Sequence, residues 1–263
     1  MLEIILVFLL LLMMIFHARQ GYSYETYLLT LPQAHDRRKV FFKHNTGGPD
    51  VQVVYGQDTR DVTTARKFED YVQPEFFEKA IEMHYDTTAV RPNITYFNLG
   101  AIGCQMGHMD IWDRASKAGH KYILVFEDNV IVKSPKLYDE VEKFIKEKGD
   151  NFEACFFHCL HYLPKPGRDV GRVLWISSTK CYLFHVPNMQ KYIPSFLPMN
   201  NHVDLKFEDI IDEGARVYFR DMRKYLVIDR SRPSTIGHRN HDEQDMFSRR
   251  HPKVHRSELI KGW

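Results

Sequence analysis

Apolar residues recur along this chain in two patterns, as short continuous runs and at helical spacing. Short, mostly apolar runs, such as Val51 to Tyr55 and Tyr122 to Phe126, predict β-strands. The second run has no polar interruption, as expected of a central strand that is covered on both faces. Between such runs, apolar side chains recur every three or four residues, for example from Gly103 to Lys117, and predict helices with one buried face.

Strands and helices alternate along the chain. The predicted strands span 27–31, 51–55, 122–126, 154–157, 173–176 and 182–186. The predicted helices span 36–44, 65–85 with an interruption at Pro74, 103–117, 137–148 and 203–213. This alternation predicts an α/β fold with a mainly parallel sheet.

Composition narrows the class of protein. The chain has 263 residues, of which 44% are hydrophobic and 27% charged, and these values are typical of a globular protein. Its length suits one α/β domain or two small domains. The formal net charge of +2 argues against nucleic acid as a partner, because dedicated nucleic-acid-binding domains are usually strongly basic.

The N-terminus holds the longest apolar segment. Thirteen consecutive apolar residues run from Ile4 to Phe16, which is fewer than the ~20 that span a bilayer but within the ~7–15 of a secretory signal. We therefore expect residues 1–23 to be a signal peptide or a membrane-retained signal-anchor, followed by one globular domain over 24–240 and a polar, basic tail over 241–263. The protein would then reside in the ER or Golgi lumen or be secreted, and the N-I-T sequon at Asn93 would be a glycan site.

Four cysteines are too few for a disulfide framework. Cys155 and Cys159 belong to an extended run and lie too far apart to bridge each other, so a disulfide would have to join distant segments, such as Cys104 with Cys181. Together with two neighbouring histidines, Cys155 and Cys159 could also form a zinc cluster. Strand alternation turns His158 to the opposite face, however, so a buried strand explains the pattern better.

An acidic cluster, Glu127-Asp128-Asn129, follows the predicted central strand directly. In open α/β sheets, ligands bind outside the carboxyl ends of the strands. Two carboxylates and an amide oxygen form the oxygen-only ligand set that Mg²⁺ and Mn²⁺ prefer, and such a cation can bridge two phosphates. The alternative is an ordinary acidic turn after a strand.

The residues before the cluster add a more specific pattern. The stretch from Gly100 to Trp112 reads G-A-I-G-C-Q-M-G-H-M-D-I-W, and Y-I-L-V-F-E-D-N follows from Tyr122. This order strongly resembles glycosyltransferase family 25, whose members have G-E-I-G-C-x-x-S-H-x-x-x-W, then an apolar strand and E-D-D. Weaker similarities to the family lie at 29–37, 53–56, 179–185 and 202–204.

The resemblance implies a GT-A-like, Rossmann-type fold with a mixed, mainly parallel sheet flanked by helices. It further implies an inverting transfer of a hexose, galactose or glucose, from a UDP-sugar to a hydroxyl of a glycan or glycoprotein acceptor. Mn²⁺ or Mg²⁺ would assist by holding the departing diphosphate.

The resemblance also implies roles for individual residues. The UDP-sugar would contact Thr30, Leu31, Asp36, Arg37, Glu127 and Asp128. The metal ligands would be Asp128, Asn129 and, near the C-terminus as in many GT-A enzymes, His238 with His241 in reserve. The residues expected to be structural are His108, Trp112 and Tyr182.

Asp204 is the candidate for the base that deprotonates the acceptor hydroxyl. Its alternative role is to cap the helix that follows it. The carboxylates that compete for the role of base are Glu208, Asp209 and Asp212.

Three residues depart from the family motif. Ala101 replaces Glu, Gly107 replaces Ser, and Asn129 replaces the last Asp of E-D-D. The position of Asn129 is the expected direct metal ligand, and an amide oxygen brings no charge, so we expect weaker metal affinity than in a standard member. A catalytically weakened or inactive binding protein with the transferase fold is therefore the main alternative.

A second alternative is an iron- and 2-oxoglutarate-dependent oxygenase, because His202, Asp204 and His255 can be written as a two-histidine, one-carboxylate iron site. The run of eight jelly-roll strands that such an enzyme needs is missing from the predicted elements, so this reading is less favoured.

Overall fold

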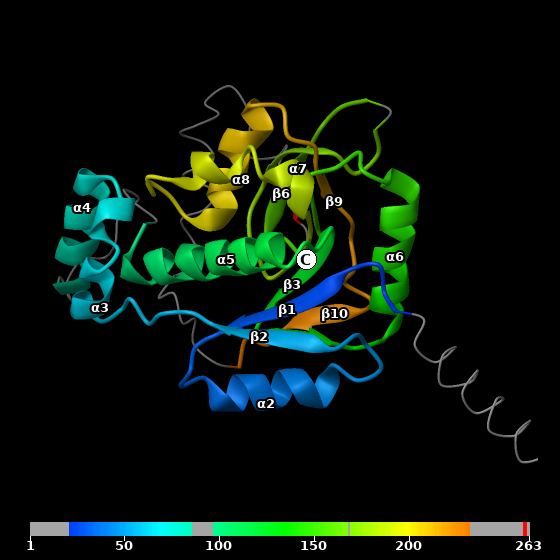
Figure 1. Ribbon diagram of the computed structural model, residues 1–263, viewed down its shortest axis with the longest axis horizontal. Coiled ribbons are helices and arrows are strands. Elements are labelled where there is room, and N and C mark those ends of the chain that lie inside the picture. The colour runs from blue at the N-terminus through cyan, green and yellow to red at the C-terminus, as the bar shows by residue number, and fades with distance from the viewer. Residues whose placement is uncertain (1–20, 86–96, 168, 232–259, 262–263) are drawn as a thin grey trace, which may run out of the picture.

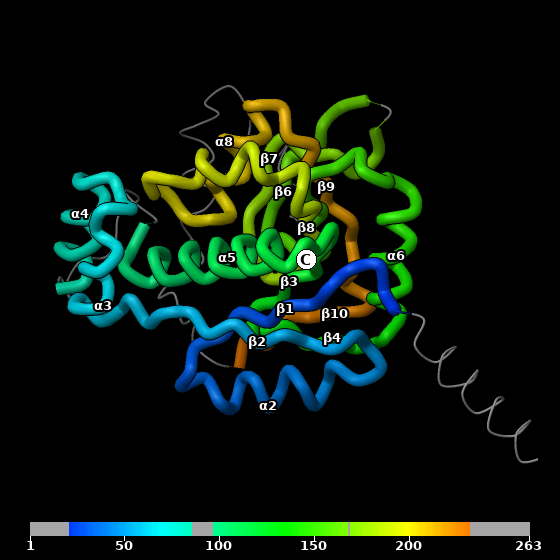
Figure 2. The backbone as a smooth tube through the Cα atoms, in the orientation of Figure 1, coloured from blue at the N-terminus to red at the C-terminus, as the bar shows by residue number. Residues whose placement is uncertain are grey.

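A six-stranded mixed sheet forms the centre of the molecule (Figures 1 and 2). The computed structural model describes residues 21–85, 97–167 and 169–231, together with the backbone of 260–261. The strands of the sheet, in spatial order, are β2 (Val51–Tyr55), β1 (Glu25–Thr30), β3 (Tyr122–Glu127), β8 (Cys181–His185), β5 (Ala154–Phe156) and β9 (Val217–Phe219). β1 runs parallel to β2 and β3, and β5 runs parallel to β9, whereas β8 is antiparallel to both of its neighbours.

Helices connect the strands and cover both faces of the sheet (Figure 1). The helices are α2 (His35–His44), α3 (Val62–Arg66), α4 (Pro74–Tyr85), α5 (Leu99–Lys117), α6 (Lys136–Lys148), α7 (Val186–Met189) and α8 (Val203–Asp212). Two 3₁₀ turns are also present, η1 (Glu69–Tyr71) and η2 (Ile193–Phe196). This mixed, mainly parallel sheet flanked by helices confirms the predicted fold class.

The strand β3 lies between two hydrophobic layers, as its uninterrupted apolar run predicts. Ile123 and Val125 face the layer formed with α5, α7 and α8, and Leu124 and Phe126 face the layer formed with α2 and α6. All four side chains are fully buried. Alternate side chains of a strand point to opposite faces, so one five-residue run joins both halves of the core.

The helix α5 crosses the sheet because small residues let it approach closely. A Cβ atom at Gly107 would lie 2.6 Å from Cδ1 of Leu29 on β1. Trp112, one turn further on, stacks on Phe184 with 4.9 Å between ring centroids. Trp112 and Tyr182 are both fully buried, which confirms that they belong to the core.

Several predicted boundaries shift in the structure. α5 begins at Leu99, four residues before the prediction, because the side chain of Asn98 caps it by accepting a hydrogen bond from the Ala101 N–H at 3.1 Å. The predicted interruption at Pro74 is confirmed, since α4 begins there, at a position where a proline needs no helical hydrogen-bond partner. The part before it is the short helix α3, which begins at Val62 and ends at Arg66, followed by the turn η1.

The chain also forms two small sheets that the sequence pattern did not predict. One pairs β4 (Val130–Val132) with β10 (Leu226–Ile228), and the other orders β11 (Ile260–Lys261), β6 (His161–Pro164) and β7 (Val173–Ile176). The predicted strand 173–176 exists, but it belongs to this second sheet and not to the central one. β4 pairs with β10, and β6 with β11, across long stretches of the chain, whereas β6 and β7 are near neighbours in the sequence.

None of the four cysteines, all of which lie in the described part of the chain, forms a disulfide. Cys155 and Cys159 belong to hydrophobic clusters on opposite faces of the sheet, contrary to the single face that continued strand alternation predicts, because β5 ends at Phe156. Neither of them is part of a metal-ligand group in the described part of the chain. Among the described helices, none is long and apolar enough to cross a membrane. The predicted signal segment up to residue 20, Asn93 and most of the predicted tail lie outside the described residues.

Candidate functional site

A pocket opens where β1 and β3 end, beside the first turns of α5. Its space measures about 480 Å³. It is lined by Leu29, Thr30, Leu31, Gly56, Gln57, Asp58, Thr59, Gly100, Gly103, Cys104, Glu127 and Asp128. The structure thus brings together four residues predicted to contact a nucleotide, because parallel strands deliver their carboxyl ends to the same edge of the sheet.

The sequence did not predict that residues 57–59 belong to this site. Thr59 ties them to α5, because its hydroxyl donates to the Leu99 carbonyl at 2.6 Å and accepts from the Gly103 N–H at 2.8 Å. Gly103 permits the approach, since a Cβ atom there would lie 2.3 Å from the Gln57 carbonyl oxygen. The glycines of the G-A-I-G motif are the signal that pointed to such a close approach.

Asp128 is buried and both of its carboxylate oxygens are bound. Thr30 Oγ1 donates to Oδ2 at 2.7 Å, and a guanidinium nitrogen of Arg37 donates to Oδ1 at 3.0 Å. The side chains of Arg37 and Asp128 are 9% and 8% exposed, so this is a buried ion pair. Asp36, the neighbour of Arg37 on α2, is exposed and does not line the pocket.

Asn129 follows in the turn between β3 and β4. Its side-chain oxygen Oδ1 is buried and has no hydrogen-bond partner, while its backbone carbonyl accepts from the Asp229 N–H at 2.7 Å. A buried oxygen without a donor suits a cation, and each oxygen of Asp128 keeps a lone pair. The Arg37 guanidinium, however, already offsets the charge of Asp128. The two residues therefore offer oxygen ligands that suit a divalent cation, of which only Asp128 lines the pocket; His238 lies outside the described residues.

Glu127 lies in a different environment from Asp128. Thr179 Oγ1 donates to Oε1 at 2.9 Å, and Lys180 Nζ forms an ion pair with Oε2 at 2.5 Å. Burial by itself raises the pKa of Glu127, but the positive charge of Lys180 and the contact with His108 outweigh it and hold that pKa well below its usual range. Glu127 is therefore a permanent anion at neutral pH.

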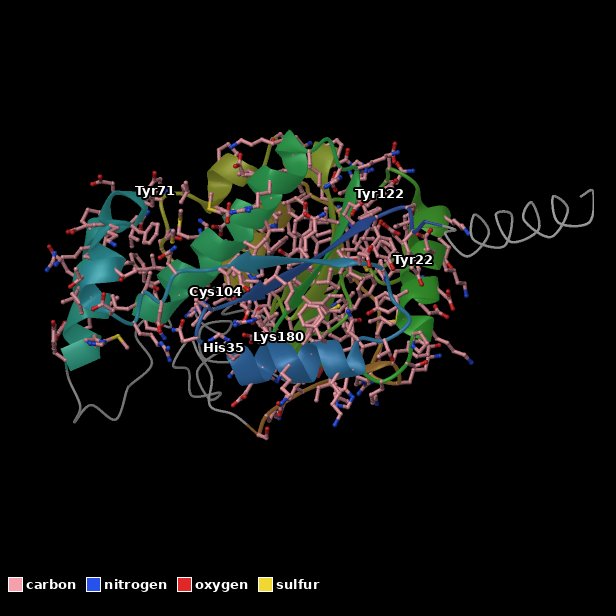
Figure 3. All side chains as sticks on the ribbon, turned by 60° about the horizontal axis from the view of Figure 1, so that its bottom comes forward. Tyr22, His35, Tyr71, Cys104, Tyr122 and Lys180 are labelled. Carbon is pink, nitrogen blue, oxygen red and sulfur yellow. The ribbon has the colours of Figure 1, made fainter. Side chains whose placement is uncertain are left out.

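Thr179 and Lys180 reach Glu127 because β8 is antiparallel to β3. The start of β8 therefore lies beside the end of β3, and the Glu127 N–H donates to the Lys180 carbonyl at 2.9 Å. The alternation of strands and helices predicted parallel neighbours, so the sequence did not predict these contacts. Cys104 and Lys180, both labelled in Figure 3, lie near each other in that view.

Asp204 lies in the first turn of α8 and is partly exposed. Its Oδ2 accepts the backbone N–H of Ser178 at 2.6 Å. It does not occupy the N-cap position of its own helix, where His202 stands without a side-chain cap. Against the opposing effect of burial, Glu127 and, to a smaller extent, Asp204 raise the pKa of Lys180, so the charge of Asp204 acts on the group around Glu127.

The three competitors of Asp204 differ in their surroundings. Glu208 is buried, Asp209 forms an ion pair with Lys206 at 2.6 Å, and Asp212 is exposed. None of them lines the pocket described above, and neither does Asp204.

The iron-site alternative loses its support in this fold. The central sheet is a mixed α/β sheet with helices on both faces and not a jelly roll. His202 is buried with its ring against the edge of Phe97, at 6.4 Å between centroids. His255, the third ligand of that alternative, lies outside the described residues.

Comparison with known proteins agrees with this geometry. A model of glycosyltransferase family 25, described as an LPS biosynthesis protein family, matches residues 24–163, which is more than half of the chain. With the mixed sheet and the pocket at its strand ends, this match defines a GT-A-like glycosyltransferase. The chain belongs to glycosyltransferase family 25.

Solved structures match the chain at low sequence identity and with TM-scores below 0.5. The apo form of mouse xyloside xylosyltransferase 1 is 10% identical, with a TM-score of 0.43 over 76% of this chain and 84% of that chain. A putative glucose-1-phosphate thymidylyltransferase from Bacillus anthracis, in complex with a sucrose, is 14% identical, with a TM-score of 0.41 over 78% of this chain and 89% of that chain. No curated protein sequence matches the chain.

Proposed function

We propose that this glycosyltransferase moves a hexose, galactose or glucose, from a UDP-sugar to a hydroxyl of a glycan or glycoprotein acceptor, with inversion of the anomeric centre. The observation that supports the proposal most is the pocket at the carboxyl ends of β1 and β3. Thr30 and Asp128 both line it, and the Thr30 hydroxyl donates a hydrogen bond to the Asp128 carboxylate. The proposal also includes a signal peptide or signal-anchor over residues 1–23 and a site of action in the secretory lumen.

The pocket offers the two kinds of surface that a nucleoside needs. Leu29 and Leu31 provide apolar contact for a base, and Gln57, Asp58 and Glu127 provide polar groups for its edge and for the ribose hydroxyls. Glu127 suits a hydroxyl in particular, because Lys180 and His108 hold it as an anion that accepts hydrogen bonds.

The chemistry of inversion requires one base and one positive region. Asp204 is proposed to take the proton of the acceptor hydroxyl as the hydroxyl oxygen attacks the anomeric carbon and the diphosphate leaves. Arg37 brings a guanidinium to the pocket end of β3, where it holds Asp128 in place. Mn²⁺ or Mg²⁺, when bound through Asp128 and Asn129, would supply further positive charge for the leaving diphosphate.

Calorimetry with UDP-galactose and UDP-glucose, each with Mn²⁺ and with a chelator, tests the donor. We expect one UDP-sugar to bind, and Thr30→Val to weaken that binding. Asp61→Asn, on the exposed side chain that caps α3, is the matched control and should bind as the wild type does. Failure of both UDP-sugars to bind would overturn the proposal.

A measurement of turnover distinguishes an active enzyme from an inactive binding protein. The second alternative is favoured by the Arg37–Asp128 ion pair and by the uncharged side chain of Asn129. Hydrolysis of the bound UDP-sugar, or its transfer to an acceptor glycan, should be lost in Asp204→Asn while UDP binding is kept. Binding without any turnover in the wild type would instead establish the binding protein.

A further inference from the structure

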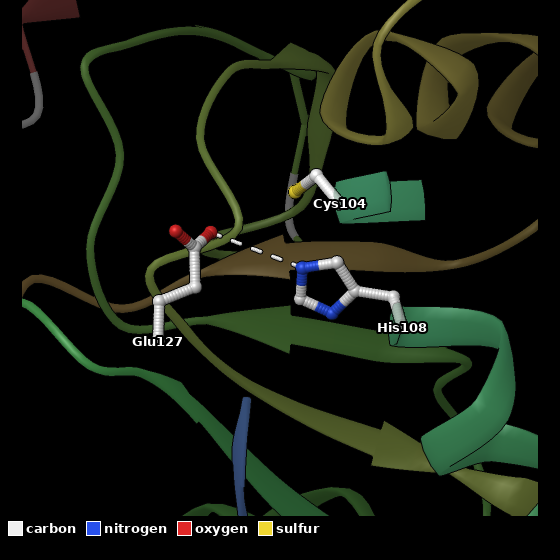
Figure 4. A group of neighbouring side chains, drawn as sticks. All are labelled: Cys104, His108 and Glu127. Carbon is white, nitrogen blue, oxygen red and sulfur yellow. Dashed lines mark ion pairs between the residues drawn. The ribbon is translucent and has the colours of Figure 1, made fainter. Parts of the chain in front are cut away.

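Three potential metal ligands meet beside the pocket, and the proposed transferase mechanism uses only one of them. One ligand atom each from Cys104, His108 and Glu127 lies within 4.8 Å of the other two (Figure 4). Cys104 and His108 are one helical turn apart on α5, so they share a face of that helix. Glu127 faces them from the end of β3.

His108 supplies the observation that points to a ligand. The side chain is fully buried, its Nδ1 lies 2.8 Å from the Tyr182 hydroxyl, and its Nε2 has no hydrogen-bond partner. Nε2 points toward Glu127, whose Oε1 lies 3.8 Å away, beyond hydrogen-bond distance (Figure 4). A buried ring nitrogen without a hydrogen-bond partner carries a desolvation cost that a bound metal ion would remove.

Tyr182 fixes the ring in an orientation suited to metal binding. Its hydroxyl accepts the Trp112 Nε1–H at 2.9 Å and contacts His108 Nδ1. Metal binding uses the tautomer in which Nδ1 donates to that oxygen, so that a lone pair of Nε2, in place of an N–H, faces Cys104 and Glu127. Histidine ligands of metals are commonly held in this way through their second nitrogen.

We propose that Cys104, His108 and Glu127 bind Zn²⁺. A thiolate, an imidazole and a carboxylate suit Zn²⁺, whereas Mg²⁺ and Mn²⁺ prefer oxygen ligands alone. Zn–ligand bonds of about 2.0–2.3 Å require the three ligand atoms to move closer than 4.8 Å, a change on the scale of side-chain rotation. Three protein ligands leave a fourth position, and Cys104 and Glu127 both line the pocket.

Lys180 is the group that opposes the ion. Its ammonium pairs with Oε2 of Glu127, while Oε1 is the oxygen nearer to His108. The ion and the ammonium therefore share one carboxylate. Thiolate and carboxylate together bring two negative charges, which offset Zn²⁺ and leave the charge of Lys180 uncompensated within the group.

Cobalt titration of the metal-free full chain tests the site, because Co²⁺ bound to a thiolate gives a near-ultraviolet charge-transfer band. We expect one equivalent of Co²⁺ to produce the band and Zn²⁺ to displace it. Cys104→Ser should abolish the band. Loss of a residue that only supports a metal ligand weakens metal binding by about 10–100-fold, and His108→Gln should weaken Co²⁺ binding by more than that. Cys155→Ala and His120→Gln, matched controls away from the cluster, should keep it.

Lys180→Met, a substitution outside α5, tests the zinc site even if the substitutions of Cys104 and His108 on α5 impair folding. A nearby unit charge changes the affinity of a site for a cation such as H⁺ by about 10–1000-fold, so we expect the Zn²⁺ dissociation constant to fall at least about tenfold. Absence of the band in the wild type, an undiminished band in Cys104→Ser, or unchanged affinity in Lys180→Met would overturn the proposal.

The zinc site does not depend on the proposed transferase activity. Failure of UDP-sugar binding would leave the cobalt band in place, and absence of the band would leave UDP-sugar binding in place. The two outcomes are therefore distinguishable in one preparation.

Discussion

Asp128 is a buried carboxylate whose charge is offset by Arg37. Its side chain is 8% exposed, and Thr30 and Arg37 bind its two oxygens. A buried charge that loses its partner costs several kcal/mol, so Arg37 contributes to folding whether or not a substrate is bound.

Arg37→Met should therefore lower the free energy of unfolding by about 3–5 kcal/mol, the usual cost of breaking a buried ion pair. Urea denaturation followed by circular dichroism measures this. Lys39→Met, at an exposed position of the same helix, should change stability by less than about 0.5 kcal/mol. Equal effects of the two substitutions would contradict the importance of the buried pair.

His158 makes stability depend on pH. Burial, helped by the positive charges of Lys180 and Arg230, lowers the pKa of His158 from 6.5 to about 4. The unfolded chain therefore takes up a proton at this residue below pH ~6.5 that the folded chain takes up only below pH ~4. Stability at neutral pH is thus lost progressively as the pH falls through this window.

From pH 7 to pH 5, this single residue should cost about 2 kcal/mol of unfolding free energy. Urea denaturation at both pH values measures the loss. His158→Gln should reduce the pH dependence by that amount, whereas His44→Gln, at the exposed end of α2, should leave it as in the wild type. An unchanged pH dependence in His158→Gln would show that the residue titrates normally.

At the scale of elements, the contact between α5 and residues 57–59 shapes the pocket. Gly103 allows the Gln57 carbonyl to approach the helix, and Thr59 bonds to both Leu99 and Gly103. The G-A-I-G motif therefore acts through close packing of backbones and not through chemistry of its own. Gly107, where the family has Ser, leaves room for Leu29 in the same way.

Gly103→Ala should destabilise the fold by about 1–3 kcal/mol, because the added Cβ forces the loop away from the helix. Thermal unfolding measures this, and UDP-sugar binding should weaken in parallel. Gly56→Ala is the matched control in the same pocket, since its Cβ would meet its nearest neighbour, Leu29 Cδ1, at an ordinary 3.5 Å. Equal destabilisation by both substitutions would contradict the packing argument.

At the scale of the whole molecule, the two hydrophobic layers bury most of the thiols. Cys155, Cys159 and Cys181 are fully buried, whereas Cys104 is partly exposed at the pocket. Burial raises the pKa of the Cys104 thiol, and the nearby carboxylate of Glu127 raises it further. The folded chain should therefore present one slowly reacting thiol.

A colorimetric thiol assay with a chelator present should find one reactive cysteine in the folded chain and four after unfolding in urea without reductant. The single reaction should accelerate as the pH rises, because the thiolate is the reactive form. A bound UDP-sugar should slow it. Fewer than four thiols after unfolding would reveal a disulfide and contradict the structure.

The sequence predicted best the elements that carry a clear apolar run or a helical period. β2 and β7 match their predictions residue for residue, and β3, β5, α6 and α8 differ by one residue. β4, β6, β9 and β10 have at most four residues each, too few to show a period. They form only because a partner strand lies beside them.

For the candidate site, the sequence by itself determined that Thr30, Leu31, Glu127 and Asp128 would meet, since strand ends of a parallel sheet share an edge. Only the tertiary structure decided that Arg37 binds Asp128, that Lys180 and His108 face Glu127, and that Asn129 keeps a buried oxygen without a partner. The physical reason is the range of the interactions. Periodicity and the succession of strands and helices are local properties of the chain. Charge pairing depends instead on β8 running antiparallel to β3 and on the close approach of α5, and no local pattern specifies either.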